Sequence, residues 1–109
     1  MVEIKELQKA IYQNKVDKGF NTTDVYMEFC SIYGELGEAF DAYIKRKDDL
    51  GEEFADVAIF LMGLCEILNI DLEKEILHKM QKNSKREYKM VDGIPIKVEE
   101  LEKNFLKNK

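Results

Sequence analysis

The stretch GEEFADVAIFLMGL, residues 51–64, places acidic side chains at the start of an apolar run. Its apolar residues recur every three or four positions, which is the period of an α-helix. On a helical projection with Asp56 at zero, Phe60 lies at roughly 40° and Glu53 at roughly 60°. Both acids therefore point in the direction of the apolar side chains. A fold that contains this helix must compensate negative charge beside its core.

Composition and apolar periodicity also predict helices in the rest of the chain. Among 109 residues there are one proline and six glycines, which favours an all-α protein. Apolar periodicity predicts four helices, over about residues 3–18, from an N-cap within 21–23 to about 45, over 50–68 and over 72–85. Short connections between them predict a four-helix bundle-like domain.

We expect residues 1–109 to form one domain, with core helices within about 3–88 and a tail over 89–109. The tail holds a turn signal, Asp92-Gly93-Ile94-Pro95, and a short closing helix is expected over about residues 99–106.

The predicted helices each carry a stripe of apolar residues that we expect to face the core. The stripe of the second helix comprises Val25, Phe29, Ile32, Leu36, Phe40 and Tyr43. In the fourth helix Leu72, Ile76, Leu77 and Met80 are expected to point inward. The two cysteines, Cys30 and Cys65, lie in apolar stretches without CxxC spacing, which predicts buried thiols.

Net charge is −5 and the pI is about 5.0, which argues against a general surface for nucleic-acid polymers. An anionic substrate would need a cation to mediate its binding. The longest uncharged stretch, residues 57–65, is too short to span a bilayer, and the N-terminus has no signal-peptide pattern. These features predict a soluble cytoplasmic protein without a membrane partner.

A second acid pair, Glu35 and Glu38, lies three residues apart in the second helix, beside small residues that would let another helix approach closely. Two unit charges about 4 Å apart repel by roughly 1 kcal/mol in water and roughly 4 kcal/mol at an effective dielectric of 20. Four clustered carboxylates therefore need protonation, basic partners or a divalent cation. All-oxygen ligation favours Mg²⁺ or Mn²⁺ over zinc. The same spacing occurs on solvated helix faces, and periodicity does not separate the two cases.

The pair Glu35-Leu-Gly-Glu38 is followed, after fourteen residues, by Glu53-Phe-Ala-Asp56. Lys79, Asn83 and Arg86 follow on the last core helix, and DKGF ends the N-terminal segment at Phe20. In these residues the chain resembles the MazG-like all-α nucleoside triphosphate pyrophosphohydrolases, a group that includes dCTP pyrophosphatase. It departs from many members at Gly34, where they carry an extra Glu, and at Phe20, where they often carry Trp.

The resemblance implies hydrolysis of a nucleoside triphosphate between its α and β phosphates, a reaction that would cleanse the nucleotide pool. Glu35, Glu38, Glu53 and Asp56 would be both catalytic and metal-holding residues. Lys79 and Arg86 would supply charge to the phosphates, Asn83 a hydrogen bond, and Phe20 and Phe60 a stacking surface for the base. Relatives form dimers or tetramers, so we expect a homodimer or homotetramer, as the abundance of apolar stripes also suggests.

Alternative interpretations stay open. Ordinary core is the simpler interpretation of Phe60, because its arc of the helix is apolar throughout. Without the resemblance, Lys79 and Arg86 would be surface charges. A non-catalytic helical interaction module would use the acid pairs to bind a basic partner. A phosphoribosyl-ATP or dUTP-specific hydrolase would differ only in substrate. His78, the single histidine, forms an ExxH pair with Glu75, but one such pair cannot build a di-iron site, and we expect it at the surface.

Overall fold

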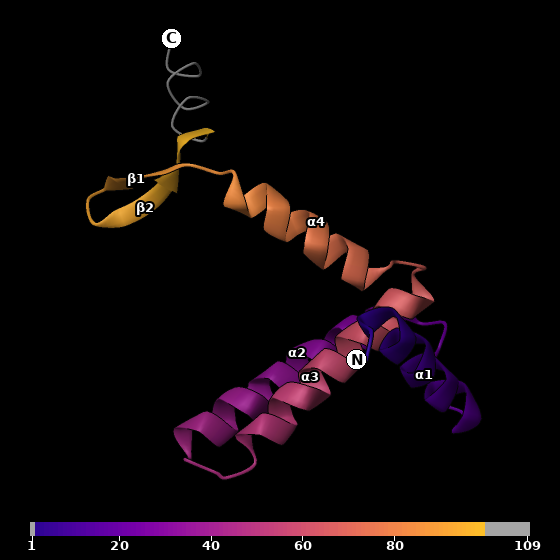
Figure 1. The fold of residues 1–109 in the computed structure, drawn as a ribbon. Helices are drawn as coiled ribbons and strands as arrows, with labels where there is room; N and C mark the ends of the chain where they lie inside the picture. The colour runs from indigo at the N-terminus through magenta and orange to yellow at the C-terminus, as the bar shows by residue number, and fades with distance from the viewer. Residues whose placement is uncertain (1, 100–109) are drawn as a thin grey trace. The chain divides into compact units, whose positions relative to one another are not determined.

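The computed structural model describes residues 2–99, which form four helices and one two-stranded sheet. The helices are α1 (Ile4–Asp17), α2 (Val25–Ile44), α3 (Leu50–Ile67) and α4 (Leu72–Ser84), and the strands are β1 (Tyr88–Val91) and β2 (Ile94–Lys97) (Figure 1). Contacts divide the chain into two compact units, Met1–Glu73 and Lys74–Lys109. The mostly helical character is confirmed, whereas the bundle and the single domain over residues 1–109 stay predictions.

The predicted helix bounds are confirmed to within about two residues, and the backbone shows why the first three helices end where they do. Gly19, with φ 71°, follows α1, and the N–H of Phe20 bonds back to the Lys15 carbonyl at 2.8 Å. The same Schellman pattern ends α2 at Arg46 and α3 at Asn69, both with positive φ. Glycine was the signal for the first of these ends, and no glycine marks the other two.

The start of α2 differs from the prediction in its capping residue. Asp24, not a residue within 21–23, is the N-cap, and its side chain accepts a hydrogen bond from the Met27 N–H at 3.1 Å. Asn21 instead orders the preceding loop, because its side chain accepts from the N–H groups of Thr23 and Asp24. Two Asx side chains three residues apart thus share the turn into the helix.

In the first unit, α2 and α3 lie side by side and antiparallel (Figure 1). The face of α2 that packs there carries small residues, because Ala39 and Ala42 are only 1% and 2% exposed. Helix α1 packs on α3, where Gly63 leaves room for Ile11 and Lys15: a Cβ on Gly63 would lie 3.3 Å from Ile11 Cγ2. Small residues thus set both helix contacts of this unit.

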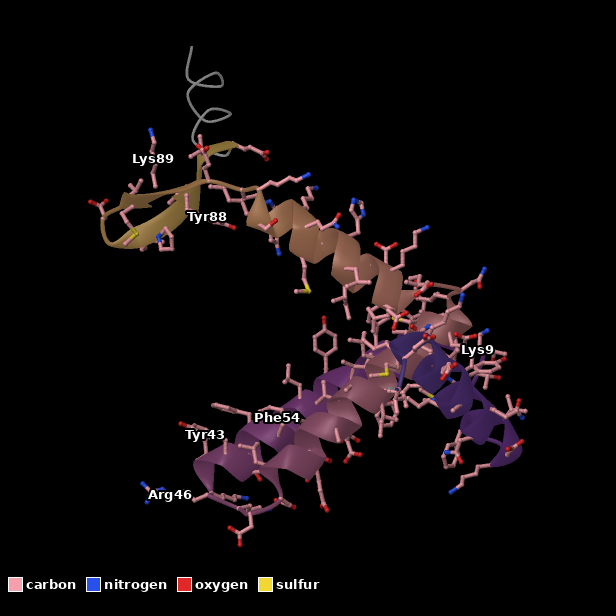
Figure 2. All side chains as sticks on the ribbon, viewed as in Figure 1. Lys9, Tyr43, Arg46, Phe54, Tyr88 and Lys89 are labelled. Atoms are coloured by element: carbon pink, nitrogen blue, oxygen red, sulfur yellow. The ribbon has the colours of Figure 1, made fainter. Side chains whose placement is uncertain are left out.

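The predicted inward stripe of α2 is wrong for most of its members. Val25 and Ile32 are half-buried, but Phe29, Leu36, Phe40 and Tyr43 are exposed, the last by 67%. Figure 2 shows Tyr43 and Phe54 extending from α2 and α3. The stripe lies roughly a quarter turn from the alanines, so the small residues pack on α3 and the bulky ones do not. Amphipathic periodicity identified the apolar stripe but not the face that packs within the chain.

Hydrogen bonds from the side chain of Gln8 connect α1 to the end of α3 and to the start of α4. Gln8 is 1% exposed, and its side-chain amide donates to Glu66 Oε2 at 3.1 Å and to the Ile70 carbonyl at 2.8 Å. Its Oε1 accepts from the Leu72 N–H at 2.9 Å, one of the backbone donors that a helix start leaves unpaired. One buried amide therefore ties three segments together.

The second unit contains a feature that the all-α prediction lacked. Strands β1 and β2 pair antiparallel from Tyr88↔Lys97 to Val91↔Ile94, and Asp92 and Gly93 form the connection with φ 53° and 79°. Two successive positive φ values define the type I′ turn that a two-residue hairpin prefers. The turn signal in the tail was correct, and its flanking strands were missed.

The prediction that four residues of α4 point inward is wrong for three of them. Ile76, Leu77 and Met80 are exposed, whereas Leu72 is half-buried. Within the described part of the second unit, no helix covers them. His78 is exposed as expected. The closing helix predicted over residues 99–106 lies, except for residue 99, outside the described residues.

Of the two cysteines, Cys65 is buried as predicted and Cys30 is exposed, which corrects that prediction. Cys30 lies on the side of α2 away from its α3 contact, so the apolar residues beside it in sequence do not cover it. Between residues 2 and 99, no helix combines the length and the apolarity that crossing a bilayer requires.

Replacing Arg46 with glycine should raise the free energy of unfolding by about 0.5–1 kcal/mol. Arg46, labelled in Figure 2, has φ 54°, which strains a residue with a Cβ and not glycine. Lys45→Gly is the matched control, because Lys45 has φ −83° and gains no relief from strain. Urea unfolding should show stabilisation at position 46 and destabilisation at position 45, and two variants of equal stability would contradict the assignment.

Candidate functional site

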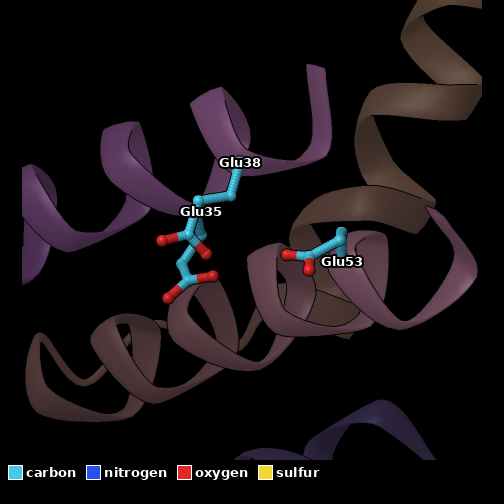
Figure 3. A group of neighbouring side chains, drawn as sticks. All are labelled: Glu35, Glu38 and Glu53. Atoms are coloured by element: carbon cyan, nitrogen blue, oxygen red, sulfur yellow. The ribbon is translucent and has the colours of Figure 1, made fainter. Parts of the chain in front are cut away.

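Three carboxylates converge between α2 and α3. Glu35 and Glu38 lie one turn apart on α2, and Glu53 reaches toward them from α3 (Figure 3). Each offers an oxygen, and these oxygens all lie within 4.8 Å of one another. The alanine face of α2 permits this approach, because bulkier residues there would hold the helices apart. The sequence predicted this convergence of both acid pairs, and the structure brings three of the four acids together.

The cluster is electrostatically unsatisfied. Glu35 Oε2 and Glu53 Oε2 are enclosed and have no hydrogen-bond partner. Burial, then the charges of Glu38 and Asp56, raise the pKa of Glu35, and a hydrogen bond with Glu38 adds to this rise. Burial raises the pKa of Glu53 as well, followed by the charge of Asp49, while Lys47 opposes the rise. Enclosed oxygens without partners are the groups that a cation would satisfy.

Asp56 differs from the other three acids. It is exposed, and its carboxylate lies outside the group of mutually close oxygens. Its charge still raises the pKa of both Glu35 and Glu53, so it lies close enough to contribute to the same field. The arrangement is three carboxylates at close range and a fourth beside them.

The carboxylate cluster suits a hard divalent cation. All three of its ligand groups are oxygens, and Mg²⁺ is held in proteins by a small number of carboxylates together with water and substrate phosphates. The exposed Glu38 leaves one side of the cluster open to solvent. The same groups without a cation would repel one another.

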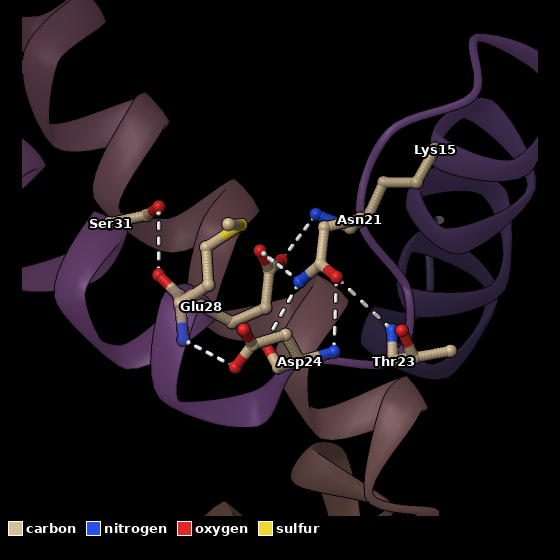
Figure 4. A network of polar contacts seen from close by, with 7 residues as sticks. Lys15, Asn21, Thr23, Asp24, Glu28 and Ser31 are labelled. Atoms are coloured by element: carbon tan, nitrogen blue, oxygen red, sulfur yellow. Dashed lines mark hydrogen bonds and ion pairs between the residues drawn. The ribbon is translucent and has the colours of Figure 1, made fainter.

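A buried ion pair, which sequence reasoning missed, lies on the same face of α2. Lys15 of α1 donates to Glu28, and the two residues are 8% and 2% exposed (Figure 4). Asn21 donates to the second Glu28 oxygen at 3.2 Å. The available signal was the spacing of Gln8 and Lys15, two polar residues seven apart on the apolar side of α1.

The two aromatic residues predicted to stack on a base meet in one cavity of the first unit. Phe20, from the loop after α1, and Phe60 of α3 line a mostly apolar cavity of about 400 Å³, together with Asn14 and Lys15 of α1. The Lys15 Nζ lies 5.5 Å from the centroid of the Phe60 ring. Phe60 is one helical turn from Asp56 on α3.

The three residues predicted to contact phosphates gather in the second unit. Arg86 Nη1 donates to Asn83 Oδ1 at 3.0 Å, and Arg86 Nε is enclosed without a partner. The charge of Arg86, then burial, and then the charges of Lys82 and Lys97 lower the pKa of Lys79. Four cationic side chains therefore share one region, which suits an anion with several charges.

None of the protein families, curated proteins or solved structures with which the chain was compared matches it.

Lowering the pH from 7 toward 5 should raise the melting temperature of the metal-free protein. Glu35 and Glu53 have folded pKa values above the usual 4.5, so the folded state holds their protons more tightly than the unfolded state does. This contribution to stability is complete below the unfolded value and is lost as the pH rises through the folded value. Circular dichroism melts in EDTA across this range measure it.

Glu35→Gln should be more stable than wild type at pH 7 in EDTA, and this advantage should shrink toward pH 5. Glu52→Gln is the matched control, because Glu52 is an exposed acid on α3 outside the cluster. An advantage of Glu35→Gln that does not change with pH would show that the cluster carries no raised pKa.

Proposed function

We propose that this protein is a Mg²⁺-dependent pyrophosphohydrolase that cleaves a nucleoside triphosphate between its α and β phosphates. The observation that carries the proposal is the convergence of Glu35, Glu38 and Glu53, with two enclosed oxygens that have no partner. The resemblance of the two acid pairs to MazG-like enzymes supplies the reaction. Water adds to phosphorus, the bridging α–β bond breaks, and a nucleoside monophosphate and pyrophosphate leave.

The metal would be held by Glu35, Glu38 and Glu53, with Asp56 beside them. A bound Mg²⁺ would neutralise charge on the triphosphate and polarise the scissile phosphoryl group. Mn²⁺ is the alternative ion for the same oxygen ligands.

The chain's own residues would divide the remaining work. Glu38 is our candidate for orienting and deprotonating water, because it is the solvent-exposed member of the cluster, whereas Glu35 has an enclosed oxygen. Lys79 and Arg86 would neutralise the phosphates, and Asn83, which already accepts from Arg86, would hold that guanidinium in place. We assign base stacking to Phe20 and Phe60, because they line one cavity.

We also propose that the active form is a homodimer or homotetramer. The exposed α2 residues Leu36, Phe40 and Tyr43 are 52%, 64% and 67% exposed. A row of large apolar side chains at helical spacing is typical of a surface that another subunit covers. The proposed site would then operate in an assembly and not in an isolated chain.

A panel of dNTPs and NTPs should yield pyrophosphate, and not orthophosphate, when the protein and Mg²⁺ are present. Cleavage between α and β releases the two terminal phosphates as one unit. The monophosphate product is identified by chromatography, and EDTA serves as the control that removes the metal. Well-folded protein that turns over no nucleotide would overturn the proposed function.

Glu38→Gln and Asp56→Asn should each reduce kcat/KM at least about 100-fold, because each removes charge that the metal and the transition state require. Both should also reduce the rise in melting temperature on adding Mg²⁺, which for wild type should correspond to about 2.7 kcal/mol at a hundredfold excess over Kd. Glu52→Gln is again the matched control and should retain activity and metal stabilisation. If all three variants were equally active, Glu38 and Asp56 would have no role in the reaction.

A further inference from the structure

The cavity beside Phe60 has one charged residue in its wall. Among the described residues that line it, Lys15 alone carries a charge, and Asn14 is the other strongly polar side chain. Cavities of this size with few fixed polar groups are typical of small-molecule sites, where the polar groups select the ligand. What Lys15 can offer a ligand therefore decides what the cavity accepts.

The Lys15 ammonium is held in place from two sides. Glu28 accepts one of its hydrogen bonds, and the ring of Phe60 lies 5.5 Å from Nζ. Asn21 in turn donates to Glu28 and fixes the carboxylate. An ammonium has three N–H donors, so the bond to Glu28 leaves donors for an acceptor in the cavity.

Stability does not explain this pair well. A buried ion pair is often no more stabilising than apolar residues of similar volume, because both charges lose their hydration. Lys15 and Glu28 are nevertheless both buried, at the wall of an otherwise apolar cavity. The ion pair places a fixed hydrogen-bond donor, the Lys15 ammonium, at the cavity wall. An apolar pair of residues would provide no such donor.

The position of the pair matches the distance that a nucleotide must cover. Glu28 precedes Glu35 by seven residues, about two turns or roughly 10 Å along α2. Phe60 follows the acids on α3 and lies one turn beyond Asp56. Because α3 runs antiparallel to α2, Phe60 is displaced from the carboxylate cluster in the same direction as Glu28. A base at the level of Lys15 would therefore have its phosphates at the level of the carboxylate cluster.

We propose that Lys15, positioned by Glu28, selects nucleotides whose base presents a carbonyl oxygen, and thereby disfavours adenine. The proposal rests on the proposed function, because it names the substrate class of that site. Uracil, thymine, cytosine, guanine and hypoxanthine all carry a ring carbonyl that can accept from an ammonium. Adenine carries none.

The comparison of dITP with dATP tests this selection. The two substrates share the purine ring and differ in the group at position 6, which is a carbonyl in dITP and an amine in dATP. Wild-type kcat/KM should favour dITP by about 10- to 100-fold, the range for a hydrogen bond to a charged donor. The double variant Lys15→Met/Glu28→Met, which leaves no single buried charge behind, should bring the ratio close to one.

The possible results separate selection by Lys15 from the hydrolase activity. A wild-type ratio near one, or a preference unchanged in the folded double variant, overturns the selection by Lys15 and leaves the hydrolase intact. If the double variant does not fold, the wild-type ratio still decides.

If neither dITP nor dATP releases pyrophosphate, NMR titration of wild-type protein with dIMP and dAMP decides the inference, and the proposed function fails only if no nucleotide of the panel is cleaved. Shifts at Lys15 and Phe60 with dIMP and not with dAMP support selection by Lys15, and equal or absent shifts overturn it.

Discussion

The close approach of α2 and α3 is the constraint on which the rest of the first unit depends. Ala39 and Ala42 let the two helices meet, and the meeting forces Glu35, Glu38 and Glu53 together. Repulsion among three carboxylates opposes the same contact, so the helix pair is held by packing against an electrostatic cost. Burial, and then the charges of neighbouring carboxylates, raise the pKa values of Glu35 and Glu53, so the contact costs both desolvation and repulsion.

The division of α2 into two faces explains both the site and the uncovered surface. Where the helix packs within the chain it carries alanines and glutamates, and its bulky residues, such as Phe40 and Tyr43, lie elsewhere. A large side chain at the packed face would separate the carboxylates and destroy the cluster. The apolar surface needed for stability is therefore placed where another molecule can bury it, which links the proposed assembly to the proposed chemistry.

Local signals in the sequence predicted the helices well, because glycine and Asx residues act through the nearest few bonds. Gly19 marked the end of α1, and the helix bounds followed. The hairpin was missed because its strands have only four residues each and Asp92-Gly93 alone does not require them. The burial of Lys15, and the exposure of Phe40, depend on which helix faces which, and periodicity carries no information about that choice. The acid pairs were predictable because their spacing restricts them to one side of each helix.

Glu28 and Glu35 provide a comparison within a single helix. They lie seven residues apart on the same face of α2, and both turn toward the interior. For Glu28 the chain supplies the compensation itself, with Lys15 on one oxygen and Asn21 on the other. For Glu35 it supplies another glutamate and leaves Oε2 without a partner. Since the same fold neutralises an inward glutamate with its own side chains at Glu28, the missing partner at Glu35 is the feature that supports the proposed Mg²⁺ site.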